Sequence, residues 1–260
     1  MDMSSKGLCT VFLLSALCSC SVKEERSDCP CYLEVDLSQT DAAYVRLNAW
    51  CGMAPVFSES VPRSRRDDFH EYRVPRGQVL LSAYRETAGL FLNGDVLAIT
   101  EGSQMDSLFA CTAPVDTDGD FARETIRLHK NFCTVSVVLK DEEDGRIDDS
   151  RMEVYGTVAG VNVQTLAPMP GRFFCIAEAA EGGGYVFRVP RQKDSSLLAE
   201  IRHDGLLVDS IPLGELIRKA GFDWSKESLG DVEILVDTPT AGFTITVREW
   251  DGPGSFSVTI

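Results

Sequence analysis

The sequence predicts an all-β protein made of antiparallel sheets, with one short helix. Most of the chain after residue 28 consists of short segments in which apolar and polar residues alternate, as in strands with one face in a core. Turn-forming residues separate these segments at intervals typical of β-sandwiches. Only residues 213–220 have a helical pattern, and Gly221 follows them at a C-cap position.

The first half of the β-rich region begins with two regular alternations. The first strand, residues 28–37, has an apolar side formed by Cys31, Leu33, Val35 and Leu37. The second, residues 44–51, has an apolar side formed by Val45, Leu47, Ala49 and Cys51. Further strands are predicted at residues 55–61, 69–74, 77–84 and 106–111, and residues 90–97 contain an Asn-Gly turn signal. No helix is predicted in this half.

An acidic stretch at residues 115–120 ends the first predicted domain. Its spacing is similar to that of an EF-hand calcium loop, but Phe121 stands where that loop needs Gly and Arg127 stands where it needs Glu. We therefore interpret it as an acidic turn and predict no metal site. The predicted domains are residues 29–124 and residues 125–260, each a β-sandwich.

The second half begins a new alternation. Its first strand has Cys133, Val135, Val137 and Leu139 on one face. Strands are then predicted at residues 152–158, 172–177, 185–189, 197–202, 206–211, 232–237, 243–250 and 256–260.

The amino terminus predicts export and lipidation. Residues 8–17 form an apolar run about as long as the core of a signal peptide and too short to span a bilayer. The run ends in Leu17-Cys18-Ser19-Cys20, which resembles the lipobox of bacterial lipoproteins. Residues 1–19 are thus a predicted signal peptide, Cys20 the lipidated residue, and residues 20–28 a tether. An ordinary secretory peptide is the alternative.

Composition limits the partners. The formal net charge is -15, and no Lys/Arg cluster is large enough to neutralise a phosphate backbone, so we predict that no nucleic acid is a partner. No apolar segment after Cys20 reaches the roughly 18 residues of a membrane-spanning helix. The protein is therefore expected to be held at a membrane by lipid alone.

Six cysteines follow Cys20, and an exported protein can form disulfides. Six cysteines allow 15 pairings, so the sequence does not select one. The favoured bridge joins Cys51 to Cys29 or Cys31, because all three lie on or near the same predicted core face. Six buried thiols are the alternative.

No catalytic motif or cofactor site is found. The three histidines are scattered, and no zinc helix, nucleophile elbow, P-loop or dinucleotide-binding glycine motif occurs. His129 precedes Cys133 by four residues, which on a strand is a rise of ~13 Å and too far for a nucleophile and its base. We expect a protein that is not an enzyme.

Three segments together resemble the FimB-like family of minor fimbrial subunits, which anchor type V pili in Bacteroidales. They are Cys20 with its charged tether, Asp28-Cys-Pro-Cys31 at the first strand, and the closing section from Leu213 through Trp224 to Trp250. The tether residues Ser21-Val-Lys-Glu-Glu25 are also similar to the surface-export signal of Bacteroidales lipoproteins.

The resemblance implies two tandem transthyretin-like sandwiches. It implies a protein on the outer surface of the outer membrane, anchored there by lipid that includes palmitate. It also implies pilin subunits as partners, joined by β-strand addition. The last predicted strand supplies the residues expected to take part in strand exchange: Phe256, Val258 and Ile260.

A surface glycan-binding lipoprotein is the alternative function, and adhesion without a pilus is a third. Sugar binding would use exposed aromatic side chains. Trp50 points outward by the alternation of its strand, whereas Trp224 and Trp250 lie near element ends, where packing at the edge of a core is the favoured interpretation.

Overall fold

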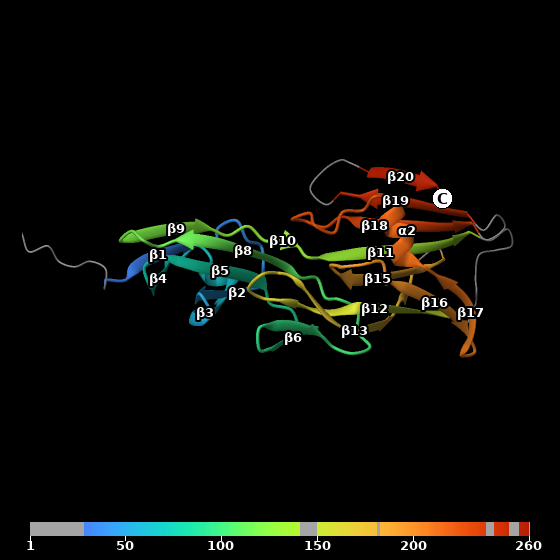
Figure 1. Cartoon of the computed structure of the whole chain (residues 1–260), viewed down its shortest axis with the longest axis horizontal. Coiled ribbons are helices and arrows are strands. Elements are labelled where there is room, and N and C mark those ends of the chain that lie inside the picture. The colour runs from blue at the N-terminus through green and yellow to red at the C-terminus, as the bar shows by residue number, and fades with distance from the viewer. Residues whose placement is uncertain (1–28, 141–149, 181–182, 238–241, 250–254, 260) are drawn as a thin grey trace, which may run out of the picture.

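The computed structural model describes residues 29–140, 150–180, 183–237, 242–249 and 255–259. This part of the chain is almost entirely β-structure with one short α-helix, which confirms the predicted fold class (Figure 1). The strands of the first half are β1 (Cys31–Asp36), β2 (Tyr44–Cys51), β3 (Ala54–Pro62), β4 (His70–Val74), β5 (Gln78–Arg85), β6 (Leu90–Asn93), β7 (Val96–Ile99), β8 (Phe109–Asp116), β9 (Phe121–Thr125) and β10 (His129–Lys130), with the 3-10 turn η3 (Arg63–Arg65) between β3 and β4.

The second half continues the β-structure. Its elements are β11 (Phe132–Lys140), β12 (Ser150–Asn162), β13 (Pro168–Ile176), β14 (Glu178–Ala179), β15 (Tyr185–Pro190), β16 (Leu198–His203), β17 (Leu206–Ile211), the helix α2 (Leu213–Lys219), β18 (Asp231–Asp237), β19 (Gly242–Arg248) and β20 (Ser255–Thr259). In the described part of the chain, no helix is both long enough and apolar enough to cross a bilayer.

The first core lies between two sheets. A three-stranded sheet has the order β4-β1-β9, and a five-stranded sheet has the order β10-β8-β5-β2-β3. Leu33 of β1 and Leu47 of β2 are both fully buried in the same cluster. Their burial confirms the predicted inward faces of both strands, because alternate residues of a strand point to one side.

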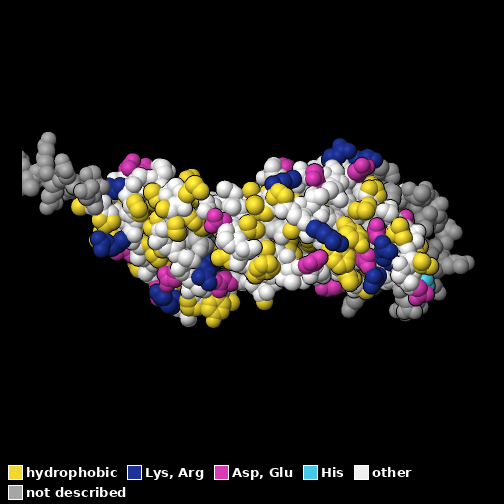
Figure 2. Space-filling view, turned by 60° about the horizontal axis from the view of Figure 1, so that its bottom comes forward, with side chains coloured by type: hydrophobic (Ala, Val, Ile, Leu, Met, Phe, Trp, Pro, Cys, Tyr) yellow, Lys and Arg dark blue, Asp and Glu magenta, His cyan; other side chains and the backbone are white. Residues whose placement is uncertain are grey.

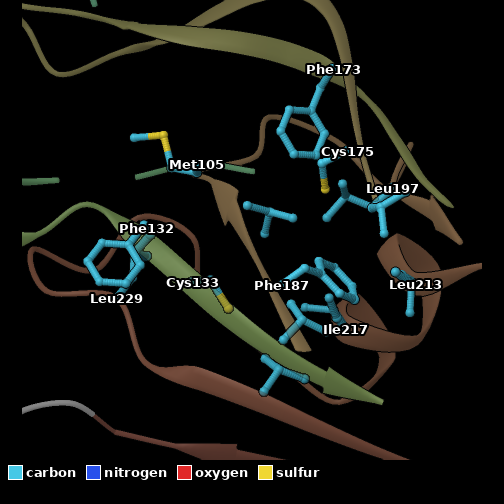
Figure 3. Packing of buried hydrophobic residues seen from close by; sticks show 14 of the residues in the cluster. Met105, Phe132, Cys133, Phe173, Cys175, Phe187, Leu197, Leu213, Ile217 and Leu229 are labelled. Atoms are coloured by element: carbon cyan, nitrogen blue, oxygen red, sulfur yellow. The ribbon is translucent and has the colours of Figure 1, made fainter. Parts of the chain in front are cut away.

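The second core is larger and also lies between two sheets. One has the order β14-β15-β11-β18-β19-β20; the other has the order β17-β16-β12-β7-β6, with β13 paired to β12. Figure 3 shows side chains from β11, β13, β15 and α2 converging in this core, among them Cys133, Phe173, Cys175, Phe187, Leu213 and Ile217. The apolar side of α2 thus packs into the core of the second sandwich.

The strands do not follow the predicted boundary at residues 124/125. Strands β6 and β7 precede it, yet β7 pairs with β12 of the second half, and Leu97 lies in the second core. Strand β9, at the end of the predicted first domain, pairs in parallel with β1, and Ile126, assigned to the second domain, lies in the first core. Two independently folding domains with this boundary stay a prediction.

The two halves meet along the outer side of the five-stranded sheet. Trp50 of β2 and Tyr84 of β5 are buried in the second core, whereas their neighbours Ala49 and Ala83 are buried in the first. The buried hydroxyl of Ser82 also donates to the carbonyl of Val163, at 2.6 Å. One sheet therefore contributes to both cores.

Two turns have the backbone conformation that their residue types favour. In the hairpin between β16 and β17, Asp204 and Gly205 have φ angles of 51° and 79°, the positive values of a two-residue hairpin loop. Gly221 has a φ of 77° and donates to the carbonyl of Arg218, which confirms the predicted end of the helix.

Candidate strand-addition site

Strand β20 is the last strand of the six-stranded sheet. It pairs with β19 on one side, with Phe256 opposite Val247 and Val258 opposite Ile245. Within the described residues, no strand pairs with its other side. A strand edge of this kind carries backbone N–H and C=O groups that can pair with another chain. The predicted exchange residues Phe256 and Val258 thus lie on a sheet edge, while Ile260 lies outside the described residues.

Little apolar surface holds β20 in place. Val258 is half-buried, and the strand's other residues are exposed on both faces, including Phe256 at 43%. In β19, by contrast, Ile245 and Val247 are buried in the core. Because hydrophobic stabilisation scales with buried apolar area, β20 relies mainly on its hydrogen bonds to β19. Those include a side-chain contact of 2.8 Å between the hydroxyls of Thr246 and Ser257.

A hollow of about 370 Å³ lies beside the start of β20. Phe222, Val247 and Phe256 give it an apolar lining, and these side chains come from the loop after α2, from β19 and from β20. A volume of this size can take one large apolar side chain from a neighbouring segment. The hollow thus provides a side-chain pocket next to a backbone edge.

Charged residues surround the hollow. Lys226 pairs with Glu249 at 2.5 Å, and Glu227 lies 3.1 Å from His129, a pair that is ionic when the histidine is protonated. Asp223 accepts hydrogen bonds from the side chain and backbone of Ser225, which lower the pKa of its carboxyl. The rim therefore combines paired charges with an additional carboxylate whose pKa lies below its ordinary value.

Two carboxylates of the acidic turn bond to groups of the protein itself. Arg76 bonds Asp120, and the Asp116 carboxylate accepts the backbone N–H of Asp118 at 3.0 Å. The described residues contain no group of three or more His, Cys, Asp or Glu side chains arranged to hold a metal ion. The carboxylates of Asp116 and Asp120 are thus both engaged, one by the backbone of the turn and one by Arg76.

The six cysteines are thiols in the structure. Cys29 is exposed, Cys51 and Cys111 are half-buried, and Cys31, Cys133 and Cys175 are buried. Cys31 begins β1 in the three-stranded sheet, whereas Cys51 ends β2 in the opposing sheet. A bridge from Cys51 to Cys29 or Cys31 stays a prediction for the oxidised protein, and Cys20 lies outside the described residues.

Trp50 is not exposed, as the sugar-binding alternative would require. Trp50 points away from the first core, as its strand alternation predicts, but the second sandwich covers it and leaves it 7% exposed. Trp224 is half-buried against Phe222, with ring centroids 4.6 Å apart, which agrees with packing at a core edge. Trp250 lies outside the described residues.

Two features were not foreseen from the sequence. Lys130 is a buried cation paired with Asp231 across the junction of the two halves. Strand β17 exposes Leu206 and Leu207, side by side, on a sheet edge. The second feature had a sequence signal, because three apolar residues follow Asp204-Gly205 without the polar alternation of a half-buried strand.

Comparison with known proteins identifies the fold. No protein-family model and no curated protein matches the chain. Among solved structures, a candidate polysaccharide-binding protein from Bacteroides thetaiotaomicron has a TM-score of 0.61 and 13% identity, over 89% of this chain and 98% of that one. The fimbrial anchor protein Mfa2 from Porphyromonas gingivalis has a TM-score of 0.59 and 11% identity, over 85% and 98%.

A candidate adhesin from Bacteroides ovatus is similar to the same degree, with a TM-score of 0.57 and 12% identity over 88% of this chain and 95% of that one. At such identities the likeness shows a common fold. It extends over both sandwiches, because each match covers 85% or more of this chain. Membership in the FimB-like family stays a prediction.

Proposed function

We propose that this chain is a surface lipoprotein that forms the membrane-anchored base subunit of a fimbria, a type V pilus, in cell adhesion. In this proposal the lipid on Cys20 holds the chain in the outer membrane, and pilin subunits join it by β-strand addition. The role is mechanical and not enzymatic. The lipobox-like Leu17-Cys18-Ser19-Cys20 supports the membrane attachment.

The observation that carries the proposal is the position of β20. The described chain begins beside β1 at one end of the long axis, whereas β20 lies in the opposite half of the molecule (Figure 1). An anchor needs this separation, because its lipid end must stay at the membrane while its partner-binding edge faces the filament. The exposed edge and the adjoining hollow suit an added strand whose side chains alternate between solvent and pocket.

The glycan-binding alternative receives less support. One similar structure is a candidate polysaccharide-binding protein, but it shares the fold at 13% identity. Trp50 is buried and is therefore not an exposed aromatic side chain of the kind that sugar binding would use. We therefore favour strand addition over a sugar platform.

Deletion of residues 255–260 tests the strand-addition step in cells. The shortened lipoprotein should reach the surface in normal amount, while filaments fail to stay attached and pilins no longer co-purify with it. The exposed pair Ser257→Ala and Thr246→Ala offers a control, since it removes one side-chain contact and keeps β20. Filaments retained at the normal number and length in a strain lacking the whole protein would refute the anchor role.

Substitution of Cys20 tests the membrane step separately. Cys20→Ala should abolish acylation and release the protein from membranes, because two or three acyl chains provide the stable attachment. Cys29→Ala, nine positions later, is the matched control and should remain in the membrane fraction. If the Cys20→Ala protein still partitioned into the detergent phase with the membrane proteins, lipid attachment at this residue would be contradicted.

A further inference from the structure

The hairpin of β16 and β17 exposes a run of apolar residues that does not pack into either core. Leu206 is 74% exposed, Leu207 54% and Val208 60%, and within β17 only Ile211 is buried. Single exposed apolar side chains are normal on a protein surface, whereas adjacent ones on an edge strand mark an interaction site or an aggregation hazard. At this end of the molecule, hydrophobic, acidic and histidine side chains lie close together (Figure 2).

The backbone of β17 is open on its outer side. The strand is the last of its sheet and pairs with β16 alone in the described part of the chain. A register shift leaves Val208 without an opposite residue on β16. The extra residue of such a bulge is not paired in the ladder, so its backbone groups are available to another segment.

The directions of the side chains indicate what can cover this edge. Leu206 lies opposite His203 and Leu207 opposite Arg202, in consecutive register, so the two leucines point to opposite faces of the hairpin. A flat protein surface would cover one of them. An extended segment paired along the edge would cover both, because its own side chains also alternate between the faces.

A lipid surface suits the hairpin poorly. The side chain of Asp204 is 81% exposed at the turn, and Asp209 is exposed further along β17. Insertion of the tip would take both carboxylates out of water. This is most costly for Asp209, which has no ion pair among the described residues, whereas Asp204 lies 3.6 Å from the ring of His203. The tether that leads to Cys20 also begins at the other end of the molecule (Figure 1).

The charge of the hairpin selects a basic partner. Arg202 is engaged by Glu200 at 2.5 Å and Glu153 at 2.9 Å, so its positive charge is compensated. Among the described residues, Asp209 has no ion pair, and its carboxylate accepts the backbone N–H of Ser210 at 2.7 Å. The net charge of -15 also opposes a second copy of the chain at this edge.

We propose that the outer edge of β17 binds an extended, Lys- or Arg-containing segment of a partner protein by β-strand addition, with its apolar side chains against Leu206, Leu207 and Val208. The inference does not depend on the fimbrial role, because β17 and β20 are edges of different sheets.

A peptide-binding measurement tests the proposal with the full lipoprotein in detergent micelles. The probe is a fluorescent ten-residue peptide in which Val alternates with Lys or Thr, and fluorescence anisotropy gives its affinity. The variant Leu206→Ser, Leu207→Ser, Val208→Ser should bind at least about tenfold more weakly, and Asp209→Asn about threefold more weakly. Thermal unfolding should be unchanged in both, since these side chains are exposed.

The other edge of the same sheet provides the matched control. Phe91→Ser with Leu92→Ser removes exposed apolar side chains from β6, at 50% and 56% exposure, and should leave peptide affinity within twofold of the wild type. Equal affinity of the β17 variant and the wild type would overturn the proposal, as would an equal loss in the β6 variant. A wild-type dimer in sedimentation that the β17 substitutions dissociate would also overturn it, in favour of a second copy.

Discussion

The ammonium group of Lys130 bonds the carboxylate of Asp231 where the two halves of the molecule meet. Lys130 lies on β10, which pairs with β8 of the five-stranded sheet, whereas Asp231 begins β18 of the six-stranded sheet. Lys130 is 1% exposed, and its ammonium also lies 4.7 Å from the ring centroid of Phe132. Asp231 accepts the backbone N–H of Thr134 as well, at 2.7 Å. The pair thus ties the two sandwiches together.

Asp231→Asn should destabilise the protein by roughly 2 to 4 kcal/mol, because it removes the acidic partner of a buried cation. The value lies below that of a fully enclosed pair, since a third of the Asp231 side chain is exposed. Urea unfolding measures the loss. The double variant Lys130→Met, Asp231→Asn should recover part of it, and a single variant as stable as the wild type would contradict a structural role for the pair.

Trp50→Ala should lower the free energy of unfolding by about 3 to 5 kcal/mol, because it leaves a large cavity where the sandwiches meet. Phe69→Ala is the control in the same half of the chain. Phe69 is 78% exposed, so its loss should change the unfolding free energy by less than about 0.5 kcal/mol. Equal effects of the two substitutions in chemical denaturation would show that Trp50 is not packed as described.

Glu153 should make stability depend on pH. Tyr155 donates to its carboxylate at 2.6 Å, and Arg151 and Arg202 add positive charge, so the pKa of Glu153 is lowered in the folded protein. A lowered folded pKa means that the stabilisation is complete above the unfolded pKa of about 4.3 and is lost as pH falls through the folded pKa.

Glu153→Gln should therefore be less stable than the wild type at pH 7 by roughly 1 to 3 kcal/mol, with the difference shrinking as the pH falls below the unfolded pKa of about 4.3. Unfolding curves at several pH values measure the difference. The exposed Glu71→Gln, on β4, serves as the control and should differ little at any pH. A difference that stays constant with pH would show that ionisation of Glu153 is not responsible.

Thiol labelling should separate exposed from buried cysteines in the reduced, folded protein. Burial raises the pKa of Cys175 to about 12 and raises the pKa of Cys133 as well, and the thiolate is the reactive form. Iodoacetamide should modify Cys29 at least about a hundredfold faster than either of them. Peptide mass spectrometry gives the rates, and similar rates for the three cysteines would contradict the described core.

The alternation of the sequence was sufficient to predict most strands and their buried faces. Leu33 and Leu47 are buried where the pattern predicts, and the helix ends just before Gly221, which has the predicted left-handed backbone. These features depend on neighbouring residues, since a strand repeats every two residues and a helix C-cap is defined by backbone conformation close by. The lipobox at Cys20 is equally local, and its lipidation stays a prediction.

Alternation alone determined the face to which a side chain points, and only the tertiary structure decided what lies opposite that face. Trp50 points outward from the first sandwich, as the alternation predicts, but the second sandwich buries it. Strand β9 pairs with β1, and β7 pairs with β12, across long stretches of chain. The open edges of β17 and β20 likewise follow from sheet order. Strand order depends on contacts between distant residues, whereas the two-residue alternation of a strand does not specify which other strand pairs with it.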